Sequence, residues 1–372
     1  MKSKAAILRQ APGKWQIEEL ELSEPGPTDV QIRIEAAGLC HSDDHFTTGD
    51  TPAEHYPLIG GHEGAGVVTA VGSDVRSVEV GDHVVTIFIP SCGKCRWCAA
   101  GMGNLCDEGA RIMAPGGGKD AFNFHTSTGE NVGQMALLGT FSQWTVVPEQ
   151  SVIKISKDIP FTSACLLACG VPTGWGAATS ATNVSAGDTV IVMGVGGIGI
   201  NSVQGARHVG AAHVLAVDPE PLKRDTALTL GATEAFESIE AAAERAQQLT
   251  NGQGADSTLV SVGVLTSEML APAFGSIRKG GTLVLTSLGR YDEAGIPINL
   301  MELALFQKRI QGSLFGAQAP REVVPRLAAL YQTGALKIDE LVTRTYGLDQ
   351  VNEAYEDMHG GKVVRAVIDM TH

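Results

Sequence analysis

The pattern of apolar and polar positions is most regular between residues 188 and 286, where short apolar runs alternate with Ala-rich stretches of helical periodicity. The apolar runs predict strands at Thr189–Met193, His213–Val217, Ser257–Val262 and Thr282–Thr286. The stretches between them predict helices at Leu222–Leu230, Ile239–Leu249 and Ser267–Phe274. Strands that alternate with helices in this way predict a parallel sheet with helices on both faces.

The parts of the chain before and after this stretch have a different, mainly β-type pattern. Residues 1–90 contain alternating and Val-rich apolar runs, of which the clearest are Gln31–Ile34, Gly64–Gly72 and His83–Ile89. Residues 91–140 are rich in Gly and Cys and predict loops, including Pro115–Lys119. Near the end of the chain we expect two helices and a closing strand, at Arg321–Tyr331, Gln350–Met358 and Lys362–Ile368. This order indicates a nucleotide-type α/β domain inserted between two parts of a β-rich domain.

Length and charge narrow the possible functions. At about 150 residues per domain, 372 residues suggest two domains. The chain has 27 Lys and Arg against 41 Asp and Glu, a net charge of −14, which argues against binding to nucleic acid or to anionic membranes. The first 15 residues lack the apolar core of a signal peptide, and no apolar run approaches the roughly 18 residues that span a bilayer. We therefore expect a cytoplasmic globular protein.

Four of the seven cysteines lie close together, with the spacing Cys92-x2-Cys95-x2-Cys98-x7-Cys106. In a chain without an export signal, such a cluster indicates metal binding rather than disulfide bonds. Four thiolates complete a tetrahedral zinc site and leave no position open, so the predicted zinc is structural. The alternative is a set of reduced thiols without metal, which the spacing makes the weaker interpretation.

A Gly-rich turn follows the first strand of the regular stretch. Gly194, Gly196 and Gly199 form a GxGxxG sequence, a helical stretch runs from there through Val209, and Asp218 ends the next predicted strand. In this context the glycines permit a tight turn, backbone approach to a pyrophosphate and close packing of helix and strand. The Asp218 carboxylate is placed to accept hydrogen bonds from an adenosine ribose and to repel a 2′-phosphate. The pattern therefore predicts a dinucleotide site that favours NAD over NADP.

Several short motifs together resemble one enzyme family. They are Cys40-His-Ser-Asp, Gly61-His-Glu-Gly-Ala-Gly-Val-Val, the four-cysteine cluster, Cys169-Gly-Val-Pro-Thr-Gly-Trp-Gly and the GxGxxG turn. In this order and spacing, over essentially the whole chain, they resemble the zinc-dependent medium-chain alcohol dehydrogenases. Three further segments resemble the bacterial nitrosoaniline-dependent nicotinoprotein branch, in which the nucleotide stays bound: Gly196-Gly-Ile-Gly-Ile-Asn, Gln204-Gly-Ala-Arg-His and Phe306-Gln-Lys-Arg-Ile-Gln-Gly-Ser-Leu-Phe-Gly-Ala.

The resemblance implies a second, catalytic zinc ion, bound by Cys40, His62 and Cys169. Two thiolates and one imidazole leave a fourth position for water or alcohol, as in other catalytic zinc sites. Glu63 is expected behind the metal as an alternative or second-sphere ligand. Asp43 is expected to hold the other ring nitrogen of His62 and so to orient that ring. The chain would then bind two zinc ions per subunit.

The resemblance also implies a proton relay. Ser42 and the nicotinamide ribose would pass the alcohol proton to His45, whose unperturbed pKa of about 6.5 suits this role. The alternative for His45 is an exposed histidine without a function.

The resemblance places further residues beside the cofactor. His41 and Arg365 match contacts to the pyrophosphate, and Lys223 is either an adenosine contact or a solvated lysine on a helix face. The predicted cofactor contacts are His41, Thr173, Gly194, Gly196, Gly197, Ile198, Gly199, Asp218, Lys223 and Arg365.

The implied architecture is α/β, with a β-rich GroES-like catalytic domain and a doubly wound parallel-sheet (Rossmann) coenzyme domain. We place the catalytic zinc domain at residues 1–170 and 315–372, with the structural zinc lobe at 91–107, and the NAD-binding domain at 171–314. The implied reaction is hydride transfer between a primary alcohol or aldehyde and NAD(H), with zinc as Lewis acid. Phe88 and Phe141 match residues that line the substrate pocket, and a homodimer or homotetramer is expected.

Two other functions remain as alternatives. A glutathione-dependent formaldehyde dehydrogenase has an arginine near the position of Arg111, but one residue out of register, so a surface arginine is the better interpretation. A non-catalytic NAD(H)-binding protein is disfavoured because the implied zinc ligands are all present. Cys165 lies four residues before Cys169, and we expect a buried thiol there rather than a metal ligand.

Overall fold

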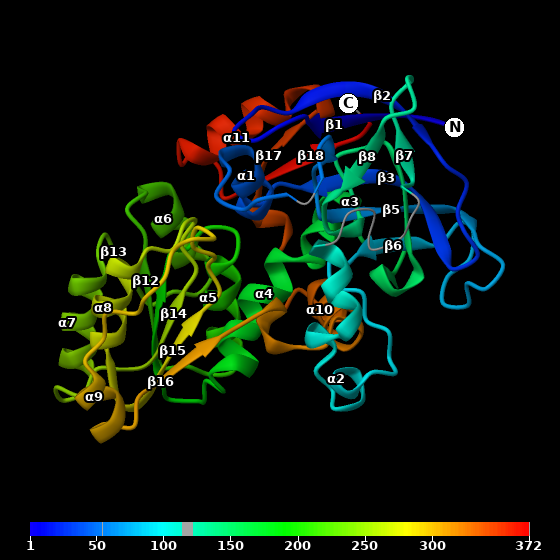
Figure 1. Cartoon of the computed structure of the whole chain (residues 1–372). Coiled ribbons are helices and arrows are strands. Elements are labelled where there is room, and N and C mark those ends of the chain that lie inside the picture. Colours follow the sequence, from blue (N-terminus) through cyan, green and yellow to red (C-terminus); the bar gives the residue numbers. More distant parts are fainter. Residues whose placement is uncertain (54, 114–121, 372) are drawn as a thin grey trace. The chain divides into compact units, whose positions relative to one another are not determined.

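The computed structural model describes residues 1–53, 55–113 and 122–371, so the segment Pro115–Lys119 lies outside the described residues. The chain forms two compact units (Figure 1). The first unit comprises Met1–Cys169 and Ala319–His372, and the second comprises Gly170–Gln318. The chain therefore leaves the first unit after Cys169 and returns to it at Ala319.

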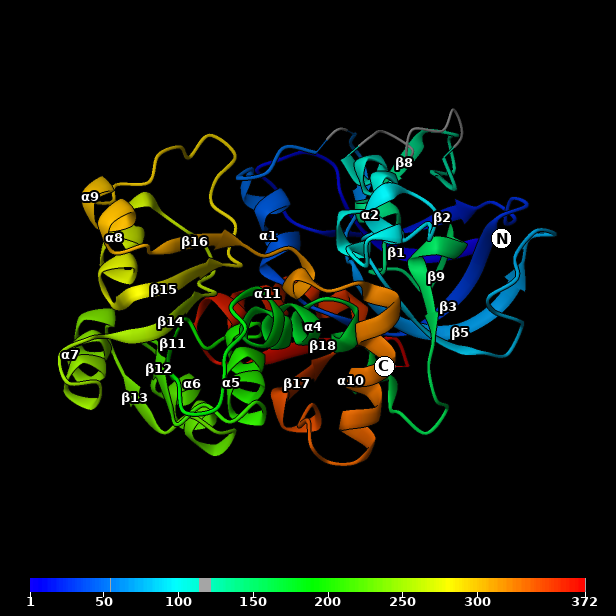
Figure 2. The ribbon, with the colours of Figure 1, turned by 90° about the horizontal axis from the view of Figure 1, so that it is seen from below.

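The second unit contains a six-stranded parallel sheet, ordered β13-β12-β11-β14-β15-β16 (Figure 2). Its strands are β11 (Thr189–Met193), β12 (His213–Val217), β13 (Glu234–Phe236), β14 (Ala255–Val260), β15 (Ile277–Leu285) and β16 (Arg309–Gly312). Its helices are α4 (Gly170–Gly176), α5 (Gly199–His208), α6 (Pro221–Thr229), α7 (Ile239–Leu249), α8 (Ser267–Gly275) and α9 (Leu300–Leu305). The strand order reverses between β11 and β14, which is the doubly wound arrangement that places ligands at this switch point.

The hydrophobic pattern predicted the four central strands, β11, β12, β14 and β15, because most of their residues are buried on both faces. Ile191, Leu215 and Ala255 lie in one apolar cluster with the buried side of α7, and Val260 and Leu283 lie in another with α8. The predicted strands β11 and β12 and helix α7 are confirmed at the same bounds, whereas β14 and β15 begin two and five residues earlier than predicted. The doubly wound parallel sheet is thus confirmed.

The first unit contains a small closed barrel, ordered β1-β2-β7-β8-β4, and a larger sheet, ordered β10-β6-β5-β3-β18-β17, in which β9 also pairs with β3. The barrel strands are β1 (Lys2–Leu8), β2 (Gln16–Leu22), β4 (Leu58–Ile59), β7 (Phe124–His125) and β8 (Asn131–Gln134). The sheet strands are β3 (Asp29–Gly38), β5 (Glu63–Val71), β6 (His83–Thr86), β9 (Trp144–Pro148), β10 (Val152–Lys154), β17 (Val342–Tyr346) and β18 (Arg365–Asp369). The β-rich domain is therefore confirmed.

Short helices connect the sheets of the first unit. They are α1 (His41–Thr48), α2 (Arg96–Ala99), α3 (Phe161–Ala164), α10 (Pro320–Gln332) and α11 (Val351–His359). The last two confirm the helices predicted near the end of the chain. The main core lies between the sheet and α11, where Ile32, Ile34 and Phe141 are at most 1% exposed.

Two expectations for the first unit were wrong in detail. Residues 91–140 are not only loops, because they contain α2 and the barrel strands β7 and β8. The polar segment after Cys40, for which no element was predicted, forms helix α1. The strand predicted at His83–Ile89 ends at Thr86. Strands of two and four residues and an eight-residue polar helix carry too little hydrophobic periodicity to be recognised.

No helix within the described ranges combines the length and the apolar character that crossing a bilayer requires.

Candidate functional site

Four side chains of the first unit converge on one buried point. Ligand atoms of Cys40, His62, Glu63 and Cys169 all lie within 4.8 Å of one another, and all four residues are buried. Cys40 is the residue before α1, and Cys169 follows a short 3-10 helix. Glu63 is the first residue of β5, and His62 immediately precedes it. The structure thus brings together residues that are up to 129 positions apart (169 minus 40).

The orientation of His62 leaves one ring nitrogen free for a ligand. Its Nδ1 lies 3.2 Å from Asp43 Oδ1, which also accepts the backbone N–H of Gly61 at 2.8 Å. Its Nε2 is buried and has no hydrogen-bond partner among the described residues. A buried polar atom without a partner is costly, and a histidine held through Nδ1 by a carboxylate is the usual arrangement of a metal-bound imidazole. The donor set therefore fits a zinc ion.

The backbone before β5 requires glycine. Gly61 has φ +86°, and a Cβ at this position would lie 2.5 Å from the backbone N of Phe141. This turn aims His62 and Glu63 toward Cys40. A side chain at Gly61 would displace both.

Burial and close charges perturb the pKa values of these groups. A hydrogen bond with Cys169 and the neighbouring His62 ring hold the pKa of Cys40 well below its usual value, against the effect of burial. The same contact and burial raise the pKa of Cys169. Burial disfavours the charged form of His62, but Asp43 and Cys40 raise its pKa above the usual value. The site therefore favours one thiolate beside a cationic partner, and a bound metal would supply that positive charge.

Glu63 and Arg365 form an ion pair that the sequence did not predict. Both side chains are buried, and Arg365 Nη2 also donates to the carbonyl of Leu39 at 3.0 Å. Burial raises the pKa of Glu63 to about 6, although the Arg365 guanidinium opposes this shift. A Cβ at Gly38 would lie 2.1 Å from Glu63 Oε2, so the pair also requires a glycine on β3. The guanidinium predicted at a pyrophosphate thus lies beside the metal-ligand cluster.

The remaining polar residues of this region lie on α1. Ser42 Oγ is 3.6 Å from Cys40 Sγ, and His41 is half-buried at the first helical position. His45 is only 3% exposed, and its Nδ1 lies 3.5 Å from Asp50 Oδ2. The alternative of an exposed histidine therefore does not describe His45.

The two phenylalanines expected at the substrate pocket differ in their surroundings. The Phe88 ring packs edge-on against His62, with 5.7 Å between ring centroids. Phe141 is fully buried between Trp15 and Tyr355. Within the first unit, Phe88 is therefore the one that contacts the ligand cluster directly.

The other four cysteines form a second cluster. The Sγ atoms of Cys92, Cys95, Cys98 and Cys106 lie within 4.8 Å of one another, and none forms a disulfide. Backbone N–H groups point at the sulfurs: Cys92 N donates to Cys106 Sγ at 3.3 Å and Cys95 N to Cys92 Sγ at 3.4 Å. The backbone N–H of Cys98 helps to lower the pKa of Cys95 to about 6. Such N–H donors stabilise thiolates, and the four thiolates of this cluster fit a tetrahedral zinc ion.

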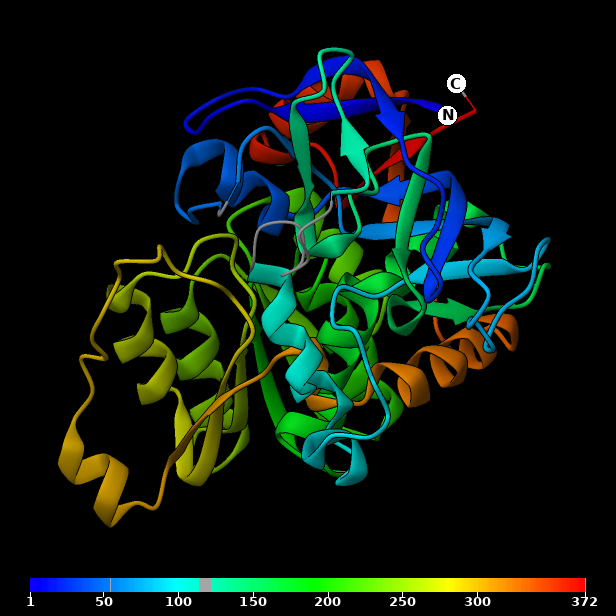
Figure 3. The same cartoon turned by 45° about the vertical axis from the view of Figure 1, so that its right-hand side comes forward.

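Helix α10 anchors this lobe within the first unit (Figure 3). Arg321 Nε donates to the carbonyl of Ser91 at 3.2 Å, next to Cys92, and its Nη2 donates to the carbonyl of Glu149 at 3.3 Å. The Ser91 hydroxyl donates to the carbonyl of Gly103 at 3.3 Å. Arg321 thus links the start of the lobe to the segment at Glu149, and the bond between Ser91 and Gly103 connects two parts of the lobe itself.

In the second unit, the Gly-rich turn connects β11 to α5. Gly194 has φ +83°, and a Cβ at Gly199 would lie 1.8 Å from the carbonyl O of Gly194. A Cβ at Gly196 would meet no atom within 4 Å, so this glycine leaves open space rather than permitting internal packing. Gly197 and Ile198 lead into the N-terminus of α5, whose positive dipole end suits an anion.

Asp218 and Thr173 lie among the predicted cofactor contacts in the same unit. The Asp218 carboxylate accepts the backbone N–H of Val195 and of Glu220, each at 3.0 Å, so it ties the Gly-rich turn to the end of β12. Thr173 on α4 is buried, and its hydroxyl has no hydrogen-bond partner among the described residues. Lys223 is half-buried in the first turn of α6.

Cys165 and Arg111 were not expected to take part in the site. Cys165 is fully buried, donates to the carbonyl of Thr162 at 3.3 Å and belongs to neither metal-ligand group, so the prediction of a buried thiol is confirmed. Arg111 is half-buried and pairs with Glu108 at 3.1 Å.

Comparison with known proteins agrees with this geometry. The family "Alcohol dehydrogenase GroES-like domain" matches residues 26–157, and the family "Zinc-binding dehydrogenase" matches residues 197–333. The NDMA-dependent alcohol dehydrogenase of Amycolatopsis methanolica is 48% identical over 99% of each chain. The S-(hydroxymethyl)glutathione dehydrogenase of Saccharomyces cerevisiae is 35% identical over 98% of this chain and 95% of its own.

A solved structure shares the fold over the full length. It is the alcohol dehydrogenase zinc-binding domain protein from Burkholderia ambifaria, with a TM-score of 0.92, 30% identity and 100% coverage of both chains. The resemblance drawn from the motifs is thereby confirmed. This chain belongs to the zinc-binding medium-chain family of alcohol dehydrogenases, and it is an enzyme of that class.

Proposed function

We propose that the protein interconverts a primary alcohol and its aldehyde with NAD(H), at a zinc ion held by Cys40, His62 and Cys169. The observation that carries this proposal is the buried His62 Nε2 without a hydrogen-bond partner, in a cluster whose ligand atoms lie within 4.8 Å. Two thiols and an imidazole leave a tetrahedral position open for substrate. Glu63, held by Arg365, is the alternative or second-sphere ligand.

When bound, zinc supplies a Lewis acid that acidifies the substrate hydroxyl, and the nicotinamide supplies the hydride acceptor. Asp43 holds the His62 ring so that Nε2 faces the site. Ser42, 3.6 Å from the Cys40 sulfur, accepts the proton that the substrate releases, and His45, three residues later on the same face of α1, carries it onward. Phe88 provides an apolar wall beside His62, which suits an apolar alcohol.

The nucleotide contacts that we propose lie mainly in the second unit. After the turn at Gly194, Gly196 presents open backbone to the pyrophosphate, and Gly197, Ile198 and Gly199 form the helix N-terminus beside it. The Thr173 hydroxyl, which has no hydrogen-bond partner among the described residues, and the half-buried Lys223 offer further polar contacts. Asp218 directly follows β12, the strand whose end binds the ribose in this fold. His41 and Arg365 complete the proposed set from the first unit.

The four-cysteine lobe holds the structural zinc in this proposal. Its backbone N–H donors point at sulfur, and four sulfurs leave no position for a substrate. The domain roles follow, with the zinc sites in the first unit and the nucleotide in the second.

We also propose that the nucleotide stays bound between turnovers. The relative from Amycolatopsis methanolica is described as NDMA-dependent, and the segment Phe306–Ala317 resembles that branch. In this segment Phe315, Gly316 and Ala317 all have positive φ, and a Cβ at Gly316 would lie 2.7 Å from Gly176 Cα. Three successive residues in this rare conformation persist only where the surrounding packing fixes the backbone. A fixed backbone at the end of the second unit favours slow release of nucleotide.

The alternatives fit less well. A glutathione-dependent formaldehyde dehydrogenase is favoured by the 35% identical yeast relative, but the NDMA-dependent relative is 48% identical, and Arg111 pairs with Glu108. A non-catalytic NAD(H)-binding protein would not need a buried set of two thiols, an imidazole and a carboxylate.

We propose a homodimer or homotetramer that acts in the cytoplasm. Strand β16 ends the parallel sheet, and its other edge pairs with no strand of the described part of the chain. Next to it, Leu300, Met301 and Leu305 are 69–73% exposed. An open sheet edge beside exposed apolar side chains suits pairing with a second copy.

The two zinc sites should respond differently to substitution. Cys40→Ser or Cys169→Ser should abolish turnover and leave a folded protein with about one zinc ion, because only the open site is lost. Cys95→Ser or Cys98→Ser should lower the unfolding temperature strongly, because structural zinc contributes folding free energy. Cys165→Ala, a buried cysteine outside both clusters, is the control and should keep both ions. Metal analysis and thermal unfolding make the measurement, and active enzyme without zinc would overturn the proposal.

Asp218 should determine the choice of nucleotide. Asp218→Ala should narrow the preference for NADH over NADPH by about tenfold or more, which corresponds to about 1.4 kcal/mol of lost repulsion and hydrogen bonding. The retained nucleotide is first removed, and fluorescence titration of the resulting protein then gives both dissociation constants. Asp225→Ala, which removes an exposed acid from α6, is the matched control. A wild type that binds NADPH as tightly as NADH would show that this role is wrong.

Retention of the nucleotide can be measured directly. The protein is gel-filtered without added nucleotide and denatured, and the released NAD(H) is quantified. We expect near-stoichiometric nucleotide, with alcohol oxidation coupled to an artificial acceptor and not to free NAD⁺. An empty protein that reduces free NAD⁺ at ordinary rates would contradict retention and leave a conventional alcohol dehydrogenase.

The oligomer should depend on the apolar surface beside β16. The double variant Met301→Lys and Leu305→Lys should sediment as a smaller species than the wild type, because two charges would be buried at the contact. Leu228→Lys, an exposed apolar position on α6, should leave the sedimentation unchanged. A wild type that sediments at the chain mass of 38.9 kDa would exclude the oligomer.

A further inference from the structure

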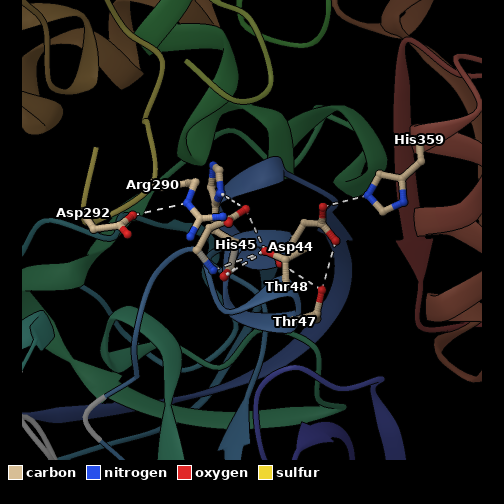
Figure 4. Close-up of polar contacts among 8 residues, drawn as sticks. Asp44, His45, Thr47, Thr48, Arg290, Asp292 and His359 are labelled. Atoms are coloured by element: carbon tan, nitrogen blue, oxygen red, sulfur yellow. Dashed lines mark hydrogen bonds and ion pairs between the residues drawn. The ribbon is translucent and has the colours of Figure 1, made fainter. Parts of the chain in front are cut away.

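Helices α1 and α11 of the first unit lie far apart in the sequence but are joined by a polar contact. His359, the last residue of α11, places its Nε2 2.7 Å from Asp44 Oδ2 on α1 (Figure 4). The Asp44 side chain is 12% exposed and the His359 side chain 50%. The other carboxylate oxygen of Asp44 accepts the Thr47 hydroxyl at 3.0 Å. The carboxylate is therefore held on both sides.

A second residue on the same face of α11, Tyr355, contacts the start of the first turn of α1. Tyr355 lies four residues before His359, so both side chains lie on one face of the helix. The buried Tyr355 hydroxyl donates to the carbonyl of Cys40 at 3.4 Å. Together, Tyr355 and His359 contact Cys40 and Asp44, the residues that bracket the first turn of α1.

This turn carries the chemistry of the proposed site. It includes Cys40 as metal ligand, Ser42 as proton acceptor and Asp43 as the residue that orients His62. Helix α1 has only eight residues, and the side chain of Cys40, its N-cap residue, makes no capping hydrogen bond. A helix this short has little stability of its own, so its orientation depends on tertiary contacts.

Helix α11 is itself firmly anchored on another side. Asp357 pairs with Arg344 on β17, accepts the Tyr346 hydroxyl at 2.9 Å and pairs with Lys362 at 2.9 Å. The last turn of α11 is thus fixed to the sheet, and it offers a rigid support from which His359 can hold α1.

We propose that His359 is a positioning residue for catalysis. It acts through Asp44 to hold the first turn of α1 in place, so that Cys40 stays beside His62 and Cys169. This inference rests on the proposed metal site. Without the contact, Asp44 would keep only the Thr47 hydroxyl as a partner while still largely buried, and the turn would shift to expose the other carboxylate oxygen to water. A displacement of about 1 Å at reacting groups costs about a hundredfold in rate, so a smaller shift should still be measurable.

The test compares His359→Ala with His359→Gln, which restores an N–H donor, and with Glu356→Gln. Glu356 is exposed on the same helix and pairs with Lys14, so it is the matched control. Each protein is loaded with Co²⁺, and the absorption of the open site is isolated by subtracting the spectrum of Cys40→Ser. The rate of metal release to a chelator, kcat, KM and the unfolding temperature are measured on the same samples.

We expect His359→Ala to shift the isolated cobalt spectrum, to speed metal release from the open site and to lower kcat about tenfold or more. His359→Gln should restore most of each quantity, and Glu356→Gln should match the wild type. Asp44→Asn should resemble His359→Ala, and the double variant should be no worse than either, because both act through one contact.

The outcomes separate the two proposals. If His359→Ala lowers only the unfolding temperature and keeps the cobalt spectrum, metal release and kcat of the wild type, the contact is structural and the positioning role is wrong. If the wild type shows no difference from Cys40→Ser in its cobalt spectrum, no metal binds at the cluster, and both the positioning role and the proposed function are overturned.

Discussion

Burial of ionisable ligands is the constraint on which the first unit depends. Cys40, His62, Glu63 and Cys169 lie within a few ångströms of one another and are shielded from water. Charged groups in such a place are costly unless each has a partner of opposite charge or a metal ion. The chain supplies Asp43 for His62, Arg365 for Glu63 and the His62 ring for Cys40, but His62 Nε2 has no hydrogen-bond partner among the described residues. A bound cation would give this nitrogen a partner.

The same constraint explains why the backbone around the cluster is rich in glycine. A Cβ at Gly38 would meet Glu63 Oε2 at 2.1 Å, and one at Gly64 would meet Thr140 Cγ2 at 2.6 Å. Close approach of β3, β5 and the segment near Thr140 is what excludes water from the ligands. These glycines thus contribute to the site through packing, although none has a functional group.

The parts that could be predicted from sequence are those with local signals. Strands buried on both faces, such as Thr189–Met193, and cysteines at fixed spacing, such as Cys92 to Cys106, carry their pattern within a few residues. The pairing of Glu63 with Arg365 and of Asp44 with His359 could not be predicted, because about 300 residues separate the partners and each is an ordinary polar residue in its own segment. Helix α1 after Cys40 could not be predicted either, because it is polar, short and stabilised by contacts from α11.

The two cysteine clusters show how burial separates structural from catalytic chemistry. In the lobe, three of the four cysteines are half-exposed, and backbone N–H groups stabilise the sulfurs without charged side chains. In the buried cluster the partners are charged side chains, each on a different element, so small movements of α1, β5 or β18 change the field at the ligands. A site whose electrostatics depend on several elements can be adjusted for reactivity, whereas one held by its own loop is suited to stability. The long-range contacts that hold these elements, including those of α11, are therefore part of the active site even where they do not touch substrate.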